Sequence, residues 1–269
     1  MQRPERAAFE AAPRARWQAG RAEDGVRELP EETAVALVHD ATTTAVMMAT
    51  PADLEDFGLG FSLTEGIVTA PDEIGGLETV ECEAGLEVRM WLRRDASVQL
   101  AARRRRLAGP SGCGLCGVDS LAEAVRPPHR VGDGLRVGGS ALLEAMNALA
   151  VAQPLGSRTR ATHAAGWWTP AEGLTLVRED VGRHNALDKL VGALARAHPV
   201  RGDGVVLITS RVSVEMVQKA AVAGAQILAA VSAPTTLAVR MAKSAGMTLV
   251  AVAREDGFEV FTGRERVLG

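Results

Sequence analysis

The chain has 269 residues, enough for one large domain or for two smaller domains with their own cores. Hydrophobic residues make up 47% and charged residues 23%, a globular balance that excludes disorder over most of the chain. The formal net charge of −3 argues against a general nucleic-acid binder or a membrane-surface protein, so we expect neither kind of partner.

Targeting signals and cysteine usage predict a cytoplasmic location. The charged N-terminus has no apolar signal core, and no apolar run reaches the roughly 20 residues of a membrane span. The three cysteines, Cys82, Cys113 and Cys116, are an odd, low number that suits a reducing compartment better than a disulfide framework.

The N-terminal third has the pattern of a small α+β unit. Residues 1–33 are polar and aperiodic, which predicts a loose extension or an edge strand. Thr50-Pro51 resembles an N-cap followed by proline at the first helical position, so we expect a helix from there towards Gly66. Two hairpins are predicted, from runs at 34–39 and 43–49 around Asp40-Ala41 and at 77–82 and 86–92 around Ala84-Gly85.

A glycine-rich segment, residues 109–117, contains Cys113 and Cys116 in a CxxC arrangement. Four glycines and a proline in nine residues predict a mobile loop. A structural zinc site would need about four ligands, and a thioredoxin-type CxxC normally opens a helix, so both are disfavoured. The preceding arginines, 103–106, would favour a thiolate, although the same run could equally form a solvated helix face.

The second half alternates between strand-like and helix-like runs, which predicts an α/β layered domain. Proline and glycine near residues 127–139 mark the boundary before it. We expect strands at 161–168, 174–177, 205–208, 227–231 and 247–252, and helices at 142–150, 185–197, 213–223 and 234–245.

Three polar segments in this half each follow a strand and open a helix: 178–185, 209–213 and 232–236. Ligands of α/β sheets bind beyond the carboxyl ends of strands, and helix N-termini suit phosphate. Each segment alone could be an ordinary helix cap, whereas the three together make an anion site an equal alternative. No GxGxxG or P-loop fingerprint is present.

Taken together, the motifs resemble the FdhD family of formate dehydrogenase accessory sulfurtransferases. The matching stretches are 53–67, 112–117, 162–167, 179–190, 210–219 and 231–239. The resemblance implies a smaller N-terminal α+β domain over 34–135, ending in the CxxC loop, and a cytidine deaminase-like three-layer α/β domain over 136–269. It also implies a homodimer.

The resemblance further implies an enzyme, a sulfurtransferase acting through a cysteine persulfide on Cys113, with Cys116 in support. Sulfur would pass from a cysteine desulfurase to the bis(molybdopterin guanine dinucleotide) cofactor, with molybdenum or tungsten, of the formate dehydrogenase catalytic subunit. The chain would hold no metal of its own. The family's cofactor-binding segment falls on Val252, Ala253, Arg254, Glu255, Asp256 and Gly257, although Glu255 and Asp256 make it unusually acidic. Further cofactor contacts are expected at Asp180, His184, Ser210, Arg211, Ser232 and Thr235.

Two other functions remain open. The chain could be a non-enzymatic chaperone that binds the same cofactor and uses the CxxC only for docking or redox chemistry. It could also be a zinc hydrolase of the deaminase type, but the His-x-Glu that such enzymes place before a cysteine pair is absent.

Overall fold

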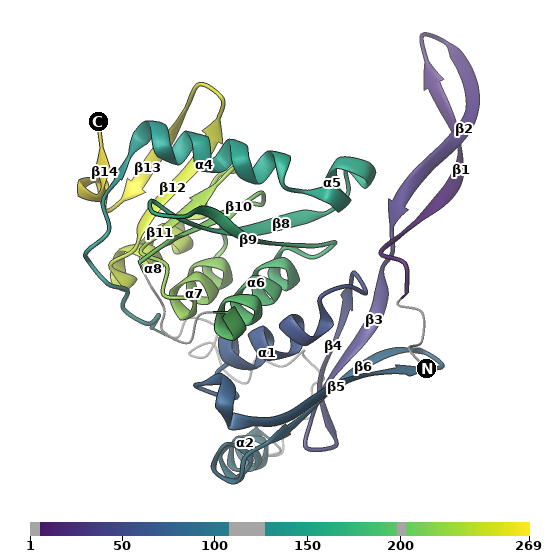
Figure 1. Ribbon diagram of the computed structural model, residues 1–269, viewed down its shortest axis with the longest axis vertical. Coiled ribbons are helices and arrows are strands. Elements are labelled where there is room, and N and C mark those ends of the chain that lie inside the picture. The colour runs from purple at the N-terminus through teal and green to yellow at the C-terminus, as the bar shows by residue number, and fades with distance from the viewer. Residues whose placement is uncertain (1–5, 108–126, 198–202) are drawn as a thin grey trace.

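A six-stranded mixed sheet forms the centre of the C-terminal half (Figure 1). The computed structural model describes residues 6–107, 127–197 and 203–269. The strands are β8 (His163–Thr169), β9 (Gly173–Asp180), β10 (Val205–Ile208), β11 (Ile227–Ala230), β12 (Thr248–Arg254) and β13 (Gly257–Thr262). Their order is β13-β12-β11-β10-β8-β9. β10, β11 and β12 are parallel, and the other neighbours pair antiparallel.

Helices cover both faces of this sheet, which makes a three-layer domain. Val206 and Ile208 of β10 face one core, and Val205 and Leu207, which alternate with them, face the other. The first face is covered by α6 (Arg183–Ala197), α7 (Val214–Val222) and α8 (Thr236–Ala245). The second is covered by α4 (Gly139–Val151), which is followed by the short α5 (Pro154–Thr159). The short strands β7 (Val137–Gly138) and β14 (Val267–Leu268) pair beside it, with a 3₁₀ turn at Arg264–Arg266.

The predicted strands and helices of this half are confirmed, with ends that differ by a few residues. β13 was not predicted; its residues are half-buried or exposed at the sheet edge. Among the described helices, none combines the length and the apolar character needed to cross a bilayer.

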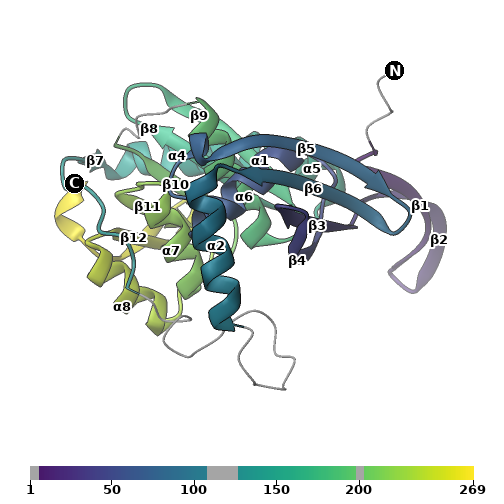
Figure 2. The same cartoon turned by 90° about the horizontal axis from the view of Figure 1, so that it is seen from below.

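The N-terminal unit contains a four-stranded sheet in the order β4-β3-β6-β5. Its elements are β3 (Thr33–His39), β4 (Thr42–Ala49), α1 (Leu54–Thr64), a 3₁₀ turn at Pro71–Glu73, β5 (Ile74–Cys82), β6 (Gly85–Leu92) and α2 (Arg94–Leu107). Both predicted hairpins are confirmed. At the first turn Asp40 and Ala41 have φ of 48° and 60°, the pair of positive angles that a two-residue hairpin turn requires. Figure 2 shows α2 at one end of this sheet.

Residues that precede this sheet form a regular hairpin, where the sequence predicts a loose extension or edge strand over 1–33. β1 (Phe9–Gln18) and β2 (Arg21–Pro30) pair antiparallel over their full length. Figures 1 and 2 both show the hairpin standing clear of the rest of the molecule. Apolar residues do alternate along β1, from Phe9 to Trp17, but polar residues interrupt the same pattern in β2, and nearly all side chains of the hairpin are exposed.

The expected N-cap at Thr50 is wrong. α1 begins only at Leu54, and its N-cap is Asp53 in the left-handed conformation. Thr50 is buried, its amide donates to the Asp180 carboxylate at 3.0 Å, and its hydroxyl accepts from the Val181 amide at 3.2 Å. Thr50 therefore does not cap a helix; its hydrogen bonds join the two halves of the chain.

α1 packs against α6 so closely that the two halves share one hydrophobic core. The contact depends on two glycines. A side-chain carbon on Gly60 would overlap the backbone carbonyl of Asp188, and one on Gly192 would overlap that of Asp56. The N-terminal unit is therefore fixed to the C-terminal domain by backbone-to-backbone contact.

Candidate functional site

One edge of the six-stranded sheet brings together the predicted polar segments. β10, β11 and β12 end at this edge, and β9 also ends there because His163, the first residue of β8, pairs with Asp180. The loops are hydrogen-bonded to one another. The Val212 amide donates to Ala233 O at 3.3 Å, and the Thr235 amide donates to Val212 O at 2.9 Å. The segments 178–185, 209–213, 232–236 and 252–257 thus form a single surface, here called the sheet-edge site.

Unpartnered polar atoms gather at the sheet-edge site. Among the described side chains, four buried nitrogen or oxygen atoms lack a hydrogen-bond partner, and three belong to Arg183 (Nε), His184 (Nε2) and Ser213 (Oγ). The first two open α6, and Ser213 directly precedes α7. Buried polar atoms are rarely left without a partner, so each such atom calls for an explanation. A polar ligand at this edge would satisfy all three.

His184 is electrically neutral at physiological pH. Burial, with the positive charges of Arg183 and Lys219 adding to it, lowers its pKa from 6.5 to about 4. Its Nε2 lies 4.0 Å from the nearest Glu215 carboxylate oxygen, too far for a hydrogen bond. The imidazole can therefore donate or accept one hydrogen bond without carrying charge. Burial likewise lowers the pKa of the neighbouring His163.

Asp180 has a structural position in this site. Its side chain is fully buried and lies 2.6 Å from the Lys189 ammonium. It also accepts from the amides of Thr50 and Gly182 and from the side chain of Asn185, at 2.7 to 3.0 Å. These bonds occupy the carboxylate and fix the turn before α6. Asp180 therefore positions the residues of the site and does not itself contact a ligand.

The remaining predicted residues of the two loops differ in how they can meet a ligand. Arg211 is exposed at the edge, and Ser232 is half-buried. Ser210 is buried, and its hydroxyl donates to Arg211 O at 3.0 Å. Thr235 performs the capping role, because its hydroxyl accepts from the Ala238 amide at 3.2 Å. Ser213 also occupies an N-cap position but makes no capping bond; its hydroxyl instead faces the Glu215 carboxylate and helps to lower the pKa of that group, after burial, which raises it.

The segment Val252–Gly257 reaches the same edge through an irregular strand end. Val252 has φ of 55°, a left-handed conformation that is strained for a β-branched residue. The pairing with β13 shifts between Ala251 and Arg254, and the Val252 amide donates to Ser232 O at 3.4 Å. Glu255 and Asp256 are exposed at the turn.

A buried charge network that the sequence did not predict lies behind the sheet-edge site. The Lys219 ammonium of α7 lies 2.9 Å from Asp188 of α6, and 2.9 Å and 3.1 Å from Thr64 and Glu65 of α1. Burial lowers the pKa of Lys219, but the carboxylates of Asp188 and Glu65 outweigh it and raise the pKa overall. A signal was present: the chain has only three lysines among 30 basic residues, and Lys189 and Lys219 are both buried in ion pairs.

The CxxC cysteines, Cys113 and Cys116, lie in 108–126, outside the described residues, as does the whole segment 109–117. The third cysteine, Cys82, is a free thiol, half-buried at the end of β5. Among the residues that the structure describes, no three His, Cys, Asp or Glu side chains are grouped as a metal site would require.

Comparison with known proteins identifies the family. Residues 30–268 match the model of the FdhD/NarQ family. Proteins named sulfur carrier protein FdhD from Agrobacterium fabrum and Brucella abortus are 51% and 50% identical, over 91% of this chain and 90% and 92% of theirs. A crystal structure of a proposed formate dehydrogenase accessory protein from Desulfotalea psychrophila superposes with a TM-score of 0.74 at 25% identity, covering 97% of this chain and all of that one. The chain belongs to the FdhD/NarQ family.

Proposed function

We propose that this protein is a sulfur carrier for formate dehydrogenase. It accepts sulfur from a cysteine desulfurase on Cys113, works as a homodimer in the reducing cytoplasm, and delivers the sulfur to the molybdenum or tungsten bis(molybdopterin guanine dinucleotide) cofactor of the dehydrogenase. Membership of the family and the sulfur-carrier names of relatives about half identical to the chain support this proposal.

The sulfur step is thiol exchange. The Cys113 thiolate attacks the outer sulfur of the donor persulfide, the sulfur–sulfur bond of the donor breaks, and the donor cysteine leaves as a thiolate. Attack of the Cys116 thiolate on the inner sulfur of the Cys113 persulfide would then release hydrosulfide and leave a Cys113–Cys116 disulfide. Both steps conserve electrons, so no external oxidant is needed, although a thiol must later reduce the disulfide.

The sheet-edge site fits the guanine dinucleotide part of the cofactor, which is the cargo of this reaction. The single observation on which this assignment rests is the gathering of buried atoms without hydrogen-bond partners on Arg183, His184 and Ser213. Arg183 supplies a charged donor for a phosphate, and the neutral imidazole of His184 and the hydroxyl of Ser213 can each donate or accept. Asp180 and Lys189 hold the turn that presents Arg183 and His184.

Calorimetry with GDP tests the cofactor site, because GDP shares guanine and phosphate with the cargo. Substituting Arg183→Ala or His184→Ala should each weaken GDP binding by about 1.5–3 kcal/mol, the value of a hydrogen bond to a charged group. Arg211→Ala, at the exposed rim of the same edge, should weaken it by a similar amount only if that arginine contacts phosphate directly. Arg264→Ala, an exposed arginine in the 3₁₀ turn before β14, is the matched control and should leave the affinity unchanged.

Intact-mass measurement after incubation with a cysteine desulfurase and cysteine tests the carrier role. The wild-type protein should gain one sulfur that a reductant removes. Cys113→Ala should abolish this gain, whereas Cys82→Ala should retain it. Full sulfur loading of the Cys113 variant would contradict the assignment. A protein that binds GDP but never gains sulfur would instead support the alternative, a cofactor chaperone without sulfur chemistry.

A further inference from the structure

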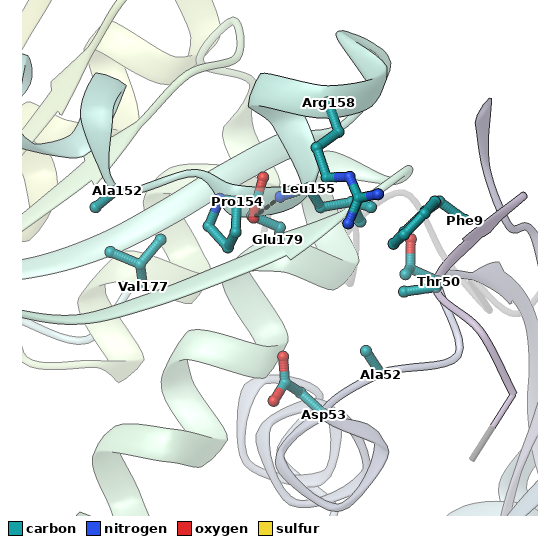
Figure 3. A pocket seen from close by; sticks show the side chains of 11 residues that line it. Phe9, Thr50, Ala52, Asp53, Ala152, Pro154, Leu155, Arg158, Val177 and Glu179 are labelled. Carbon is teal, nitrogen blue, oxygen red and sulfur yellow. Dashed lines mark hydrogen bonds between the residues drawn. The ribbon is translucent and has the colours of Figure 1, made fainter. Parts of the chain in front are cut away.

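A cavity of about 320 Å³ lies on the side of β9 that faces away from α6 (Figure 3). The chain at the start of β1, the segment that leads into α1, and the turn between α4 and α5 enclose it. Val177 and Glu179 of β9 line the cavity, whereas Asp180 points to the other face of the strand, where it pairs with Lys189. The cavity is therefore separate from the sheet-edge site, and both halves of the chain contribute to it.

The walls of this cavity are mainly apolar. Phe9, Ala152, Leu155 and Val177 are among the residues that line it. Its volume lies at the lower end of the range for small-molecule sites, about 300–1,000 Å³. A cavity of this size can enclose one small molecule with an apolar side chain. It is too small to enclose a molybdopterin guanine dinucleotide, so the proposed cargo is not its ligand.

Arg158 presents a fixed positive charge to the cavity. Its guanidinium stacks 3.7 Å from the centre of the Phe9 ring, and its Nε and Nη2 atoms donate to the Glu28 carboxylate. Its Nη1 atom donates no hydrogen bond within the described part of the chain. Because stacking and pairing already hold the guanidinium, the remaining N–H groups can receive an anion with little further loss of side-chain entropy.

Asp53 supplies a negative charge from the other side of the cavity. It is the N-cap residue of α1, yet its side chain makes no capping bond. The Nε atom of Arg178 lies 3.6 Å away, too far for a hydrogen bond, and this guanidinium donates instead to Asp56 at 2.7 and 2.9 Å. Figure 3 shows the Asp53 carboxylate pointing towards the cavity from the start of α1, while Arg158 enters from α5. A residue type that usually caps helices is thus directed at the cavity.

Glu179 supports the wall between these two groups. Its side chain is buried and accepts from the amides of Leu155 and Gly156 at 2.9 and 2.6 Å. These bonds fix the first turn of α5, the helix that carries Arg158. Because its oxygens already have donors, Glu179 shapes the cavity, and its negative charge adds to the attraction of Asp53 for a cation.

We propose that this cavity binds a free α-amino acid with an apolar side chain, independently of the sulfur chemistry. The α-carboxylate accepts from Arg158 Nη1, the α-ammonium donates to Asp53, and the side chain packs against Leu155 and Val177. An amine alone would leave the Arg158 donor without a partner, and an acid alone would lie beside the negative charge of Asp53. The end of a peptide chain carries only one of the two charges. A free zwitterion satisfies both groups at once.

Calorimetry with L-leucine and L-phenylalanine tests the proposal. Each amino acid is compared with the acid that lacks its ammonium group and the amine that lacks its carboxylate. For leucine these are 4-methylpentanoate and 3-methylbutylamine, and for phenylalanine 3-phenylpropionate and 2-phenylethylamine. At least one amino acid should bind with a Kd of about 1 mM or tighter, and its acid and its amine should each bind at least about 10-fold more weakly.

Two variants assign the charged ends of the ligand. Asp53→Asn keeps a residue type that tolerates the left-handed conformation. It should weaken the amino acid by at least about 10-fold without weakening the acid. Arg158→Gln should weaken the amino acid by a similar factor without weakening the amine. Glu55→Gln is the matched control, because this carboxylate is 53% exposed, stands two residues further along α1 and does not line the cavity. It should leave all three affinities unchanged.

Three results would each overturn the proposal. The first is that neither amino acid binds the wild-type protein at about 10 mM. The second is that the acid or the amine binds as tightly as the amino acid. The third is that the Asp53 and Arg158 variants weaken all three ligands equally, which would give these residues a purely structural role. Circular dichroism melting of each variant checks that the fold is intact.

Discussion

Two of the attachments between the N-terminal residues and the C-terminal domain differ in kind. At the α1–α6 contact, backbone touches backbone at Gly60 and Gly192, and Lys219 is buried among carboxylates. At the hairpin base, Arg158 pairs with Glu28 and stacks on Phe9 on a surface that is largely open to solvent. The first attachment fixes the geometry of the molecule, whereas the second only orients an arm.

This difference matters for sulfur transfer, if the protein is a carrier as proposed. The sheet-edge site and the buried network lie on α6 and α7, the same helices that hold α1. Because α1 and α6 are in backbone contact, one half cannot rotate against the other without separating a packed core. Any travel of sulfur between donor and cofactor must therefore use segments outside this interface.

The largest loss of stability is expected from glycine substitution at the α1–α6 contact. Gly60→Ala would drive a side-chain carbon into the Asp188 carbonyl and force α1 away from α6. We expect the free energy of unfolding to fall by about 4 kcal/mol or more, at the severe end of single substitutions. Chemical denaturation measures it. Gly25→Ala in β2 is the control, since nothing lies within 4 Å of its added carbon, and it should change stability by less than about 0.5 kcal/mol. Equal losses of unfolding free energy at Gly60 and Gly25 would contradict the difference between the rigid attachment and the hairpin.

The second-largest loss of stability is expected at the buried ion pair of Lys219 and Asp188. Lys219→Met leaves the Asp188 carboxylate without its countercharge in a site that is almost fully buried, which should cost about 3–5 kcal/mol of unfolding free energy. Adding Asp188→Leu should restore much of that loss, because an apolar pair leaves no charge buried. Arg196→Met is the control at the rim of the same interface. The arginine side chain there is 52% exposed and pairs with Glu55 and, at 3.3 Å, with Asp56. Asp56 keeps Arg178 as a partner, so the loss of Arg196 should cost less than about 1 kcal/mol.

A smaller effect is expected from His184 in the sheet-edge site, as a dependence of stability on pH. Its pKa is about 4 when folded and near 6.5 when unfolded, so between these values the unfolded chain binds the extra proton. The stability due to the neutral imidazole is therefore present above pH 6.5 and is lost as the pH falls towards 4. His184→Gln should flatten this part of the profile by roughly 2 kcal/mol, allowing for the partial exposure of the ring. Profiles that stay parallel down to pH 4 would show that His184 does not titrate as described.

Sequence patterns predicted what depends on local chemistry. The alternation of strands and helices gave the three-layer domain, because buried runs and amphipathic helices are visible within a dozen residues. The convergence of 209–213 and 232–236 also followed from the rule that loops after parallel strands meet at one edge. Segment 178–185 reaches the same edge for another reason: β9 is antiparallel to β8, which is antiparallel to β10. The cofactor proposed for this site comes from the family resemblance, because no pattern in these segments specifies one.

The missed features depend on partners far away in the sequence. Thr50 has the local chemistry of an N-cap, but hydrogen bonds to residues about 130 positions away decide its role. The scarcity of lysine marks Lys219 as unusual, but nothing in its helix identifies Asp188 and Thr64 as its neighbours. The left-handed Val252 violates residue preference, so only the bulge in the folded sheet reveals it. The hairpin was missed because its apolar face has no core within the chain to indicate burial.

The smallest expected effect on global stability comes from the hairpin attachment, and it sharpens the comparison most. Arg158→Ala removes both the pairing with Glu28 and the stacking on Phe9. Exposed ion pairs contribute little, so the free energy of unfolding should hardly change. Locally the consequence should be larger. Among the described residues, the other polar contact from the hairpin to α5 is the Arg27 bond to Thr159 O, at 3.0 Å. Hydrogen exchange over β1 and β2 should therefore become faster, while α1 and α6 keep their protection, since local opening and global unfolding are separate equilibria. Arg160→Ala, an exposed neighbour at the end of α5, is the control and should leave exchange in the hairpin unchanged. If Arg158→Ala instead lowered the protection of α1 and α6 as well, the hairpin would belong to the same cooperative unit as the core, and the distinction between a rigid attachment and an oriented arm would fail.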